Sequence, residues 1–117
     1  MRHEHYILND KGEPVIEPDL ITWARWMEKG ERQVALTKID TLAGQVSVST
    51  VFLRLDHNWT GRFPVLWETM IFGGPHDQDC ERCAGSREQA QAMHETTVQR
   101  LVSEDAALQN AGSHAEK

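Results

Sequence analysis

The sequence predicts a small α+β domain: an antiparallel meander of three to four strands, with one helix before and one helix after the main hairpin. Two patterns predict this fold. Apolar and β-branched residues concentrate between Val46 and Gly74, in two runs joined by a turn-rich segment. On either side of this stretch, apolar residues recur at helical spacing, first from Leu20 to Met27 and then from Ala90 to Val102.

The two runs predict the main hairpin. Val46 and Val48 alternate with serines, as in a half-buried strand. Val51 then takes an apolar position of the opposite phase, so we expect a bulge near Ser49–Thr50 that swaps the strand's faces. The second run, Val65–Phe72, is almost wholly apolar, which predicts a strand covered on both faces.

Two further strands are expected ahead of the hairpin. Tyr6–Leu8 is a short apolar run followed by an Asn9–Gly12 turn, which suits a strand at a sheet edge. The segment from Glu13 to Pro18 holds two prolines, so we expect an extended chain there. Gln33–Ile39 is the next strand, and its short link to the hairpin favours a meander.

The first helix should begin after Asp19, whose side chain can accept hydrogen bonds from the free amides, and end at Gly30. Trp26 lies off its apolar stripe. For Trp26 we favour a boundary position with the indole nitrogen near water over a role in an aromatic contact patch. The stripe itself consists of Leu20, Trp23, Ala24 and Met27.

The second helix should start with a capping box formed by Ser86 and Gln89. The apolar stripe of the helix consists of Ala90, Met93, His94, Thr97, Val98, Leu101 and Val102. Because the apolar pattern fades after this stripe, we expect a single domain over residues 1–105 and a frayed or disordered tail over residues 106–117.

Charge and composition restrict the classes of function. The chain has 117 residues, with 12 Lys plus Arg against 18 Asp plus Glu. Such a balance argues against general nucleic-acid binding, which needs clustered cations. No apolar run approaches the roughly 20 residues that span a bilayer, and the N-terminus lacks a signal-peptide pattern, so we expect a cytoplasmic protein without membrane contact.

The sharpest chemical pattern is a candidate zinc set of His76, Cys80, Cys83 and His94. A Cys-x2-Cys pair can bind one metal ion from a tight turn, and imidazoles can complete a tetrahedral site. A single such pair is only half of the usual structural zinc signature. His94 also falls on the apolar stripe of the second helix, where a buried, hydrogen-bonded histidine is the ordinary explanation. We therefore keep zinc as a cofactor in an alternative hypothesis.

Asp56-His57 and Glu68 form a second cluster. A histidine held by a carboxylate can act as a general base or a metal ligand, so a metal-dependent hydrolase belongs to the same alternative. Glu68 could equally form a structural ion pair with Arg54 or Arg62, and we favour that interpretation. No complete catalytic motif accompanies the cluster, so enzymatic activity stays undecided.

The turn-rich segment also carries an aromatic candidate. Trp59 lies in the connection between the hairpin strands, and Arg62 and Phe63 follow it closely. Tryptophan and arginine are enriched at binding hot spots, so we predict that His57, Trp59, Arg62 and Phe63 contact a partner. The alternative is a loop tryptophan folded back over the sheet edge.

The chain contains the contiguous run VSTVFL from Val48, the run Leu55-Asp56-His57, and the segment from Leu66 to Gly74. These three runs resemble those of a group of small uncharacterised phage and prophage proteins. The resemblance covers about half of the chain and implies a phage or prophage origin, without implying an activity. This sequence departs from the group at Arg54, Trp67 and Cys83, where the group has glycine, phenylalanine and tyrosine. The tyrosine argues against a zinc site common to the group.

The leading hypothesis is a non-enzymatic phage or prophage accessory protein that binds another macromolecule, either a host or a phage protein. The alternative is a small zinc-binding protein or metal-dependent hydrolase that uses the Cys80/Cys83 loop or the His57/Glu68 pair. Mimicry of nucleic acid by the acidic surface ranks last. We also consider a homodimer in which Ile39, Val46 or Trp67 faces the second subunit.

Overall fold

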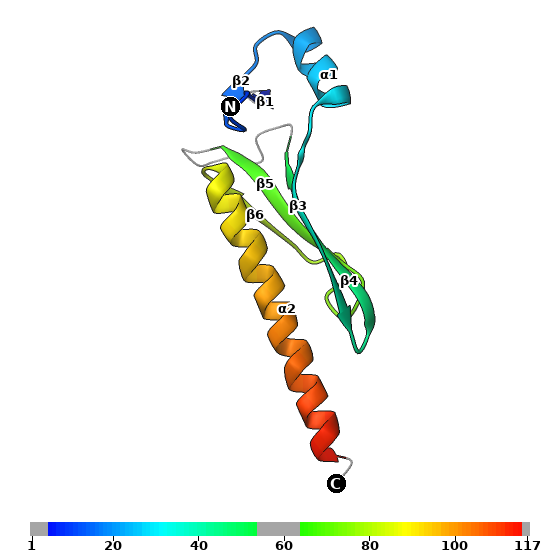
Figure 1. Ribbon diagram of the computed structural model, residues 1–117. Coiled ribbons are helices and arrows are strands. Elements are labelled where there is room, and N and C mark those ends of the chain that lie inside the picture. Colours follow the sequence, from blue (N-terminus) through cyan, green and yellow to red (C-terminus); the bar gives the residue numbers. More distant parts are fainter. Residues whose placement is uncertain (1–4, 54–63, 116–117) are drawn as a thin grey trace.

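The computed structural model describes residues 5–53 and 64–115, with side chains up to residue 111. Within this part of the chain there are two helices and six strands (Figure 1). The main sheet is a four-stranded antiparallel meander in the order β3-β4-β5-β6, with α1 before it and α2 after it. The predicted α+β fold is therefore confirmed. The four strands are β3 Gln33–Thr41, β4 Gly44–Phe52, β5 Val65–Phe72 and β6 Cys80–Ala84.

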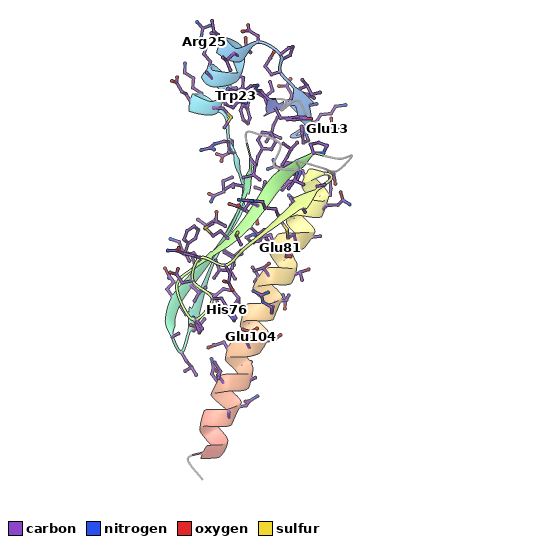
Figure 2. The ribbon with its side chains drawn as sticks, turned by 180° about the vertical axis from the view of Figure 1, so that it is seen from behind. Glu13, Trp23, Arg25, His76, Glu81 and Glu104 are labelled. Carbon is purple, nitrogen blue, oxygen red and sulfur yellow. The ribbon has the colours of Figure 1, made fainter. Side chains whose placement is uncertain are left out.

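A separate N-terminal unit lies at one end of the molecule. It consists of a two-stranded hairpin, β1 Tyr6–Leu8 with β2 Pro14–Ile16, and the helix α1 Leu20–Lys29. The predicted turn between the strands is confirmed: the Asn9 side-chain oxygen accepts hydrogen bonds from the amides of Lys11 and Glu13, both at 2.9 Å. Figure 2 shows Trp23 and Arg25 at this end, and His76 and Glu104 far from it along the molecule.

The predicted caps of α1 are confirmed. The Asp19 carboxylate accepts from the Thr22 hydroxyl at 2.9 Å and from the Ile21 amide at 3.0 Å, and these bonds lower the pKa of Asp19. The predicted stripe, however, does not form a buried face, because α1 has no buried residue and Leu20 is 59% exposed. Half-buried Trp26, at the edge of the stripe, makes the contact with the core: its ring meets Phe52 edge-on at 5.8 Å.

Strand β4 keeps one phase along its length. Val46, Val48, Thr50 and Phe52 are all buried, so the predicted change of face near Ser49–Thr50 is wrong. Thr50 can occupy a buried apolar position because its hydroxyl is hydrogen-bonded there. A register irregularity does lie opposite this point, but on β3, between Gln33 and Ala35.

The edge strand β6 was not predicted. Its residues looked like a polar loop, yet they pair with β5 from Cys80 opposite Met70 to Ala84 opposite Val65. Most of β6 is exposed, and an exposed edge strand needs no apolar alternation to form its backbone hydrogen bonds. The neighbouring strand β5 agrees with the predicted run Val65–Phe72. Its last residue is 47% exposed, however, so the expected cover on both faces is incomplete.

Helix α2 Arg87–Ala115 packs against one face of the sheet (Figure 1). The predicted capping box is confirmed, since Ser86 N donates to the Gln89 side chain at 2.8 Å and Gln89 N donates to the Ser86 hydroxyl at 3.2 Å. The helix continues through the segment expected to fray and ends at Ala115. Fraying of residues 106–117 in solution stays a prediction.

The core lies between α2 and the sheet. One cluster joins Leu8, Phe52, Leu66, Trp67 and Ala90, and a second joins Val46, Val48, Ile71, Val98 and Leu101. Trp67 is fully buried, and its indole nitrogen donates to Gly85 O at 2.8 Å. Val46 is 4% exposed, and half-buried Ile39 packs against the second cluster. These three residues therefore face the core, and the expectation that they form a dimer surface is wrong.

Candidate functional site

The predicted partner-binding residues His57, Trp59, Arg62 and Phe63 lie outside the described residues, as do Asp56 and Arg54. Glu68 is described. Its carboxylate accepts from Arg82 Nε at 2.7 Å across the β5–β6 pair. The structural interpretation of Glu68 is thus supported, and the partner in the described residues is Arg82, which was not among the arginines considered. Arg82 was not considered as a partner of Glu68 because β6 had not been predicted as a strand.

The two cysteines do not form the expected metal-binding turn. Both lie in β6, three residues apart, and side chains at this spacing point to opposite faces of a strand. Cys80 is exposed, whereas half-buried Cys83 packs against the first core cluster. Burial and the nearby Glu81 carboxylate raise the pKa of Cys83, which disfavours the thiolate that metal binding needs.

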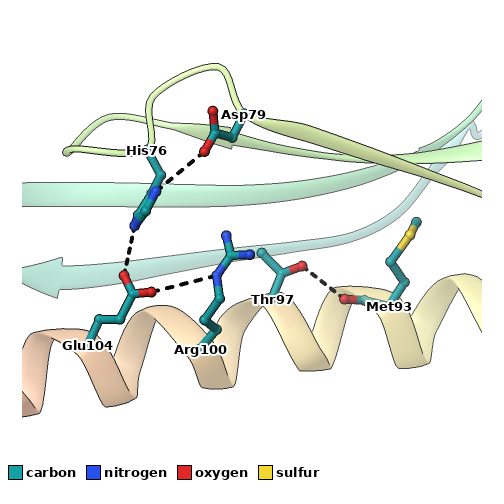
Figure 3. A network of polar contacts seen from close by, with 6 residues as sticks. All are labelled: His76, Asp79, Met93, Thr97, Arg100 and Glu104. Carbon is teal, nitrogen blue, oxygen red and sulfur yellow. Dashed lines mark hydrogen bonds and ion pairs between the residues drawn. The ribbon is translucent and has the colours of Figure 1, made fainter.

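The two candidate histidines also lie apart, in different environments. His76, in the loop before β6, contacts the Glu104 carboxylate at 2.8 Å and the Asp79 carboxylate at 3.4 Å (Figure 3). His94 is buried under the sheet and is only 1% exposed. Nowhere in the described segments do three or more His, Cys, Asp or Glu side chains gather as metal ligands would. The predicted zinc set is therefore not assembled.

His94 is the centre of a buried polar chain that joins α2 to three strands. Its Nε2 lies 2.8 Å from the Thr37 hydroxyl, and its Nδ1 lies 2.8 Å from the Thr50 hydroxyl. Thr50 in turn contacts the Thr69 hydroxyl at 2.5 Å. Burial lowers the pKa of His94, while the Glu95 carboxylate acts in the opposite direction. The ordinary explanation of this histidine as a satisfied core residue is supported.

The direction of the hydrogen bonds in this chain is coupled to the histidine tautomer. If Nδ1 carries the proton, it donates to Thr50, which then donates to Thr69, and Nε2 accepts from Thr37. If Nε2 carries the proton, every bond in the chain reverses. In either tautomer both ring nitrogens are satisfied, as a buried polar group requires.

A polar groove of about 280 Å³ opens beside this chain, between α2 and the β5–β6 edge. Its charges are of both signs, from Asp79, Glu81 and Arg100. Figure 3 shows Arg100 directed toward Glu104, with 3.9 Å between Nε and Oε1, and the Thr97 hydroxyl donating to Met93 O. The full lining is Thr69, Ile71, Asp79, Cys80, Glu81, Thr97 and Arg100.

The groove is better suited to holding α2 in place than to chemistry. The hydroxyls of Thr69 and Thr97 already have partners inside the protein. The ion pairs around His76 and Glu104 are solvent-exposed, and such pairs contribute little to binding or stability. Among the described side chains around the groove, no hydrogen-bonded pair of nucleophile and base is present.

The threonine chain could have been found in the sequence. Extending the alternation of Val46 and Val48 by two residues reaches Thr50, and continuing it reaches Phe52. Two apolar neighbours in phase with a threonine predict a buried hydroxyl that needs a partner. The sequence offers no corresponding signal that this partner would be His94.

No helix in the described segments is long and apolar enough to cross a membrane. Comparison of the chain with protein-family models, with curated proteins and with solved structures gave no match. The class that fold and site define is a small α+β protein with a buried chain of His94 and three threonines between its helix and its sheet.

Proposed function

We propose that this chain is a non-enzymatic binding protein whose N-terminal unit contacts another macromolecule. The observation that supports the proposal is the exposure of apolar side chains between β2 and the first turn of α1. Val15 is 37% exposed, Ile16 53%, Leu20 59% and Ile21 65%. Large apolar side chains gathered on one small unit of a protein are typical of an interaction surface.

The packing of α1 strengthens this proposal. The helix has ten residues and is capped at both ends, but none of its residues is buried. Helices of this length are marginal in water unless an apolar face is packed against something. Trp26 anchors one side of α1 to the core, and the side that carries Leu20 and Ile21 has no cover from the described residues. A partner seated there would bury it.

The proposed partner class and origin rest on the resemblance of three sequence runs. The resemblance to phage and prophage proteins makes a host or phage protein the expected partner, and a phage accessory role the expected context. The net charge of −6 disfavours a nucleic acid as the partner. Among the described residues, no grouping of metal ligands supports the alternative of a zinc-binding protein or metal-dependent hydrolase.

Quantitative affinity capture from host lysate tests the proposal, followed by titration of the purified captured protein against this chain. Leu20→Glu/Ile21→Glu should weaken that interaction at least tenfold, because two charges would have to be buried against the partner. The variant should keep its fold, since both side chains are already exposed.

The matched control is Leu42→Glu, which changes a 66% exposed leucine in the turn between β3 and β4, away from α1 (Figure 1), and should leave binding unchanged. A captured protein that binds the double variant as tightly as the natural chain would remove α1 from the partner surface. In the same assay, Trp59→Ala tests the partner contact that the sequence predicts for His57, Trp59, Arg62 and Phe63.

A further inference from the structure

Strand β3 forms one edge of the main sheet, and its outer side pairs with no described strand. Thr41 and Gly44 flank the two-residue turn to β4 and therefore form a hydrogen-bonded pair. Such pairs alternate along an antiparallel ladder, so the backbone N–H and C=O groups of Leu36, Lys38 and Asp40 point away from β4. These groups can form hydrogen bonds with another extended strand.

The side chains of the same three residues are exposed, on the face of β3 opposite to Thr37 and its contact with His94. Leu36 is 50% exposed. Among the described residues, neither Lys38 nor Asp40 has an ion-pair partner. A lysine on an edge strand commonly blocks pairing with another chain. An aspartate two residues away reverses this effect for a second copy of the same strand, because each charge then has an opposite charge to meet.

A single antiparallel register between two copies of β3 pairs these charges. When Lys38 lies opposite Asp40 of the second copy, Asp40 lies opposite Lys38 of that copy, so the register makes two identical ion pairs. Both residues of each pair have outward-pointing backbone groups, as a hydrogen-bonded antiparallel pair requires. Moving the register by one such pair in either direction would place Lys38 opposite Lys38 or Asp40 opposite Asp40. The charges therefore specify this register.

The same register also brings exposed apolar side chains together. Leu36 comes next to Leu42 of the second copy, and Leu42 is 66% exposed in the turn between β3 and β4. The two-fold axis passes between the two Ile39 backbones. Each Ile39 side chain stays on the α2 side, against the second core cluster of its own copy, so the contact is made by the edge of β3.

We propose that β3 pairs with β3 of a second copy of this chain, in a two-fold antiparallel ladder with Lys38 opposite Asp40. The two four-stranded sheets then form one continuous sheet, with both α2 helices on the same side. Only residues 36–42 of each copy take part, so the dimer should be weak and concentration-dependent. This inference is independent of the binding function proposed for α1.

Charge exchange between two variants tests the register. By sedimentation equilibrium between about 5 and about 500 μM, the mass of the natural chain should rise from 13.3 kDa toward twice that value. Lys38→Asp alone and Asp40→Lys alone should each weaken self-association about tenfold, because each places like charges opposite each other twice. In an equimolar mixture of the two variants, both pairs join a lysine with an aspartate, so association should return to the natural level.

The matched controls are Lys11→Asp and Asp10→Lys, which make the same changes of charge in the exposed turn between β1 and β2. Each control should associate like the natural chain. A natural chain with the mass of one copy at every concentration would overturn the proposal. A mixture of Lys38→Asp with Asp40→Lys that associates no better than either component would overturn it as well.

Hydrogen exchange locates the pairing by a second measurement. The amides of Lys38 and Asp40 should become protected as concentration rises, because they donate to the second copy only in the dimer. The amides of Thr37 and Ile39 donate to β4 in both states, so their exchange should not depend on concentration. A dimer that leaves Lys38 and Asp40 unprotected would place the interface elsewhere and overturn the proposal. None of these outcomes bears on capture through α1.

Discussion

A single buried histidine connects the helix to the sheet in this protein. His94 reaches Thr37 of β3 and Thr50 of β4 through its two ring nitrogens, and Thr50 passes the chain on to Thr69 of β5. Side-chain bonds in a dry interior have defined geometry and penalise any displacement that leaves a group unsatisfied. The chain therefore fixes the position of α2 along the sheet more narrowly than apolar packing alone would.

The stability of the fold should depend on pH through His94. Burial lowers its pKa below the ordinary value of 6.5, so well above pH 6.5 the residue is neutral in both states and its contribution to stability is complete. As pH falls below 6.5, the unfolded chain binds a proton that the folded chain resists. The free energy of unfolding should therefore fall, by at most about 1.4 kcal/mol per pH unit.

Urea unfolding of the natural chain and of His94→Gln from pH 7.5 to 5 measures this effect. The glutamine cannot titrate, so the difference in unfolding free energy between the two proteins should shrink as pH falls. A constant difference over that range would show that His94 titrates alike in both states.

At the scale of elements, the start of α2 depends on a glycine. Gly85 has φ of +105°, and a Cβ there would lie 1.7 Å from the Gln89 side-chain oxygen that caps Ser86 N. Gly85 O also accepts the indole proton of Trp67. The strand end, the capping box and the core tryptophan thus meet within a few residues.

Gly85→Ala should lower the free energy of unfolding by about 2 kcal/mol, about half from the strained backbone and half from the displaced cap. Gly44→Ala is the matched control: Gly44 has φ of +102°, but a Cβ there has open space around it. Only the backbone cost of about 1 kcal/mol should remain in that variant. Equal losses in thermal or urea unfolding would mean that the cap contributes nothing.

The sequence predicts these elements unevenly. Capping residues and apolar periodicity placed α1, β3, β4, β5 and the start of α2, because each signal is local. The edge strand β6 was missed, since exposed strand residues carry no alternation and the pairing that creates the strand is made by distant β5. The predicted change of face in β4 failed for a related reason. From the sequence alone, Thr50 counts as a polar residue that should face solvent, because its hydrogen-bond partner His94 lies on another element.

At the scale of the whole molecule, the chain is elongated. Its extents are 64 × 30 × 22 Å, and its radius of gyration is 17.5 Å. A compact chain of this length would have a radius of gyration of about 13 Å. The N-terminal unit at one end and the long α2 account for the difference (Figure 1).

The far part of α2 contacts the sheet near the turn between β3 and β4. There Leu42 N donates to the Asp105 carboxylate at 3.0 Å, and Leu108 lines a small apolar groove.

Truncation after Asn110 should change the free energy of unfolding by less than about 0.5 kcal/mol, because the fold contacts described for α2 end at Leu108. Truncation after Val102 should be clearly destabilising, since it also removes Asp105 and Leu108. Urea unfolding compares the two, and hydrogen exchange on the full chain should show protection falling beyond Leu108. A large loss from the shorter deletion would mean that the last turns of α2 pack against the fold.

The sequence by itself determined the α+β class, the caps of α1, the capping box of α2 and three of the four strands of the meander, because these depend on residues close together in the chain. Only the tertiary structure decided which polar residues meet. Spacing suggested Cys80 and Cys83 as a metal-binding pair, but strand pairing placed them on opposite faces and left His94 among threonines. Strand pairing also decided which face of the sheet stays open, because register is set between segments that are separated in the sequence.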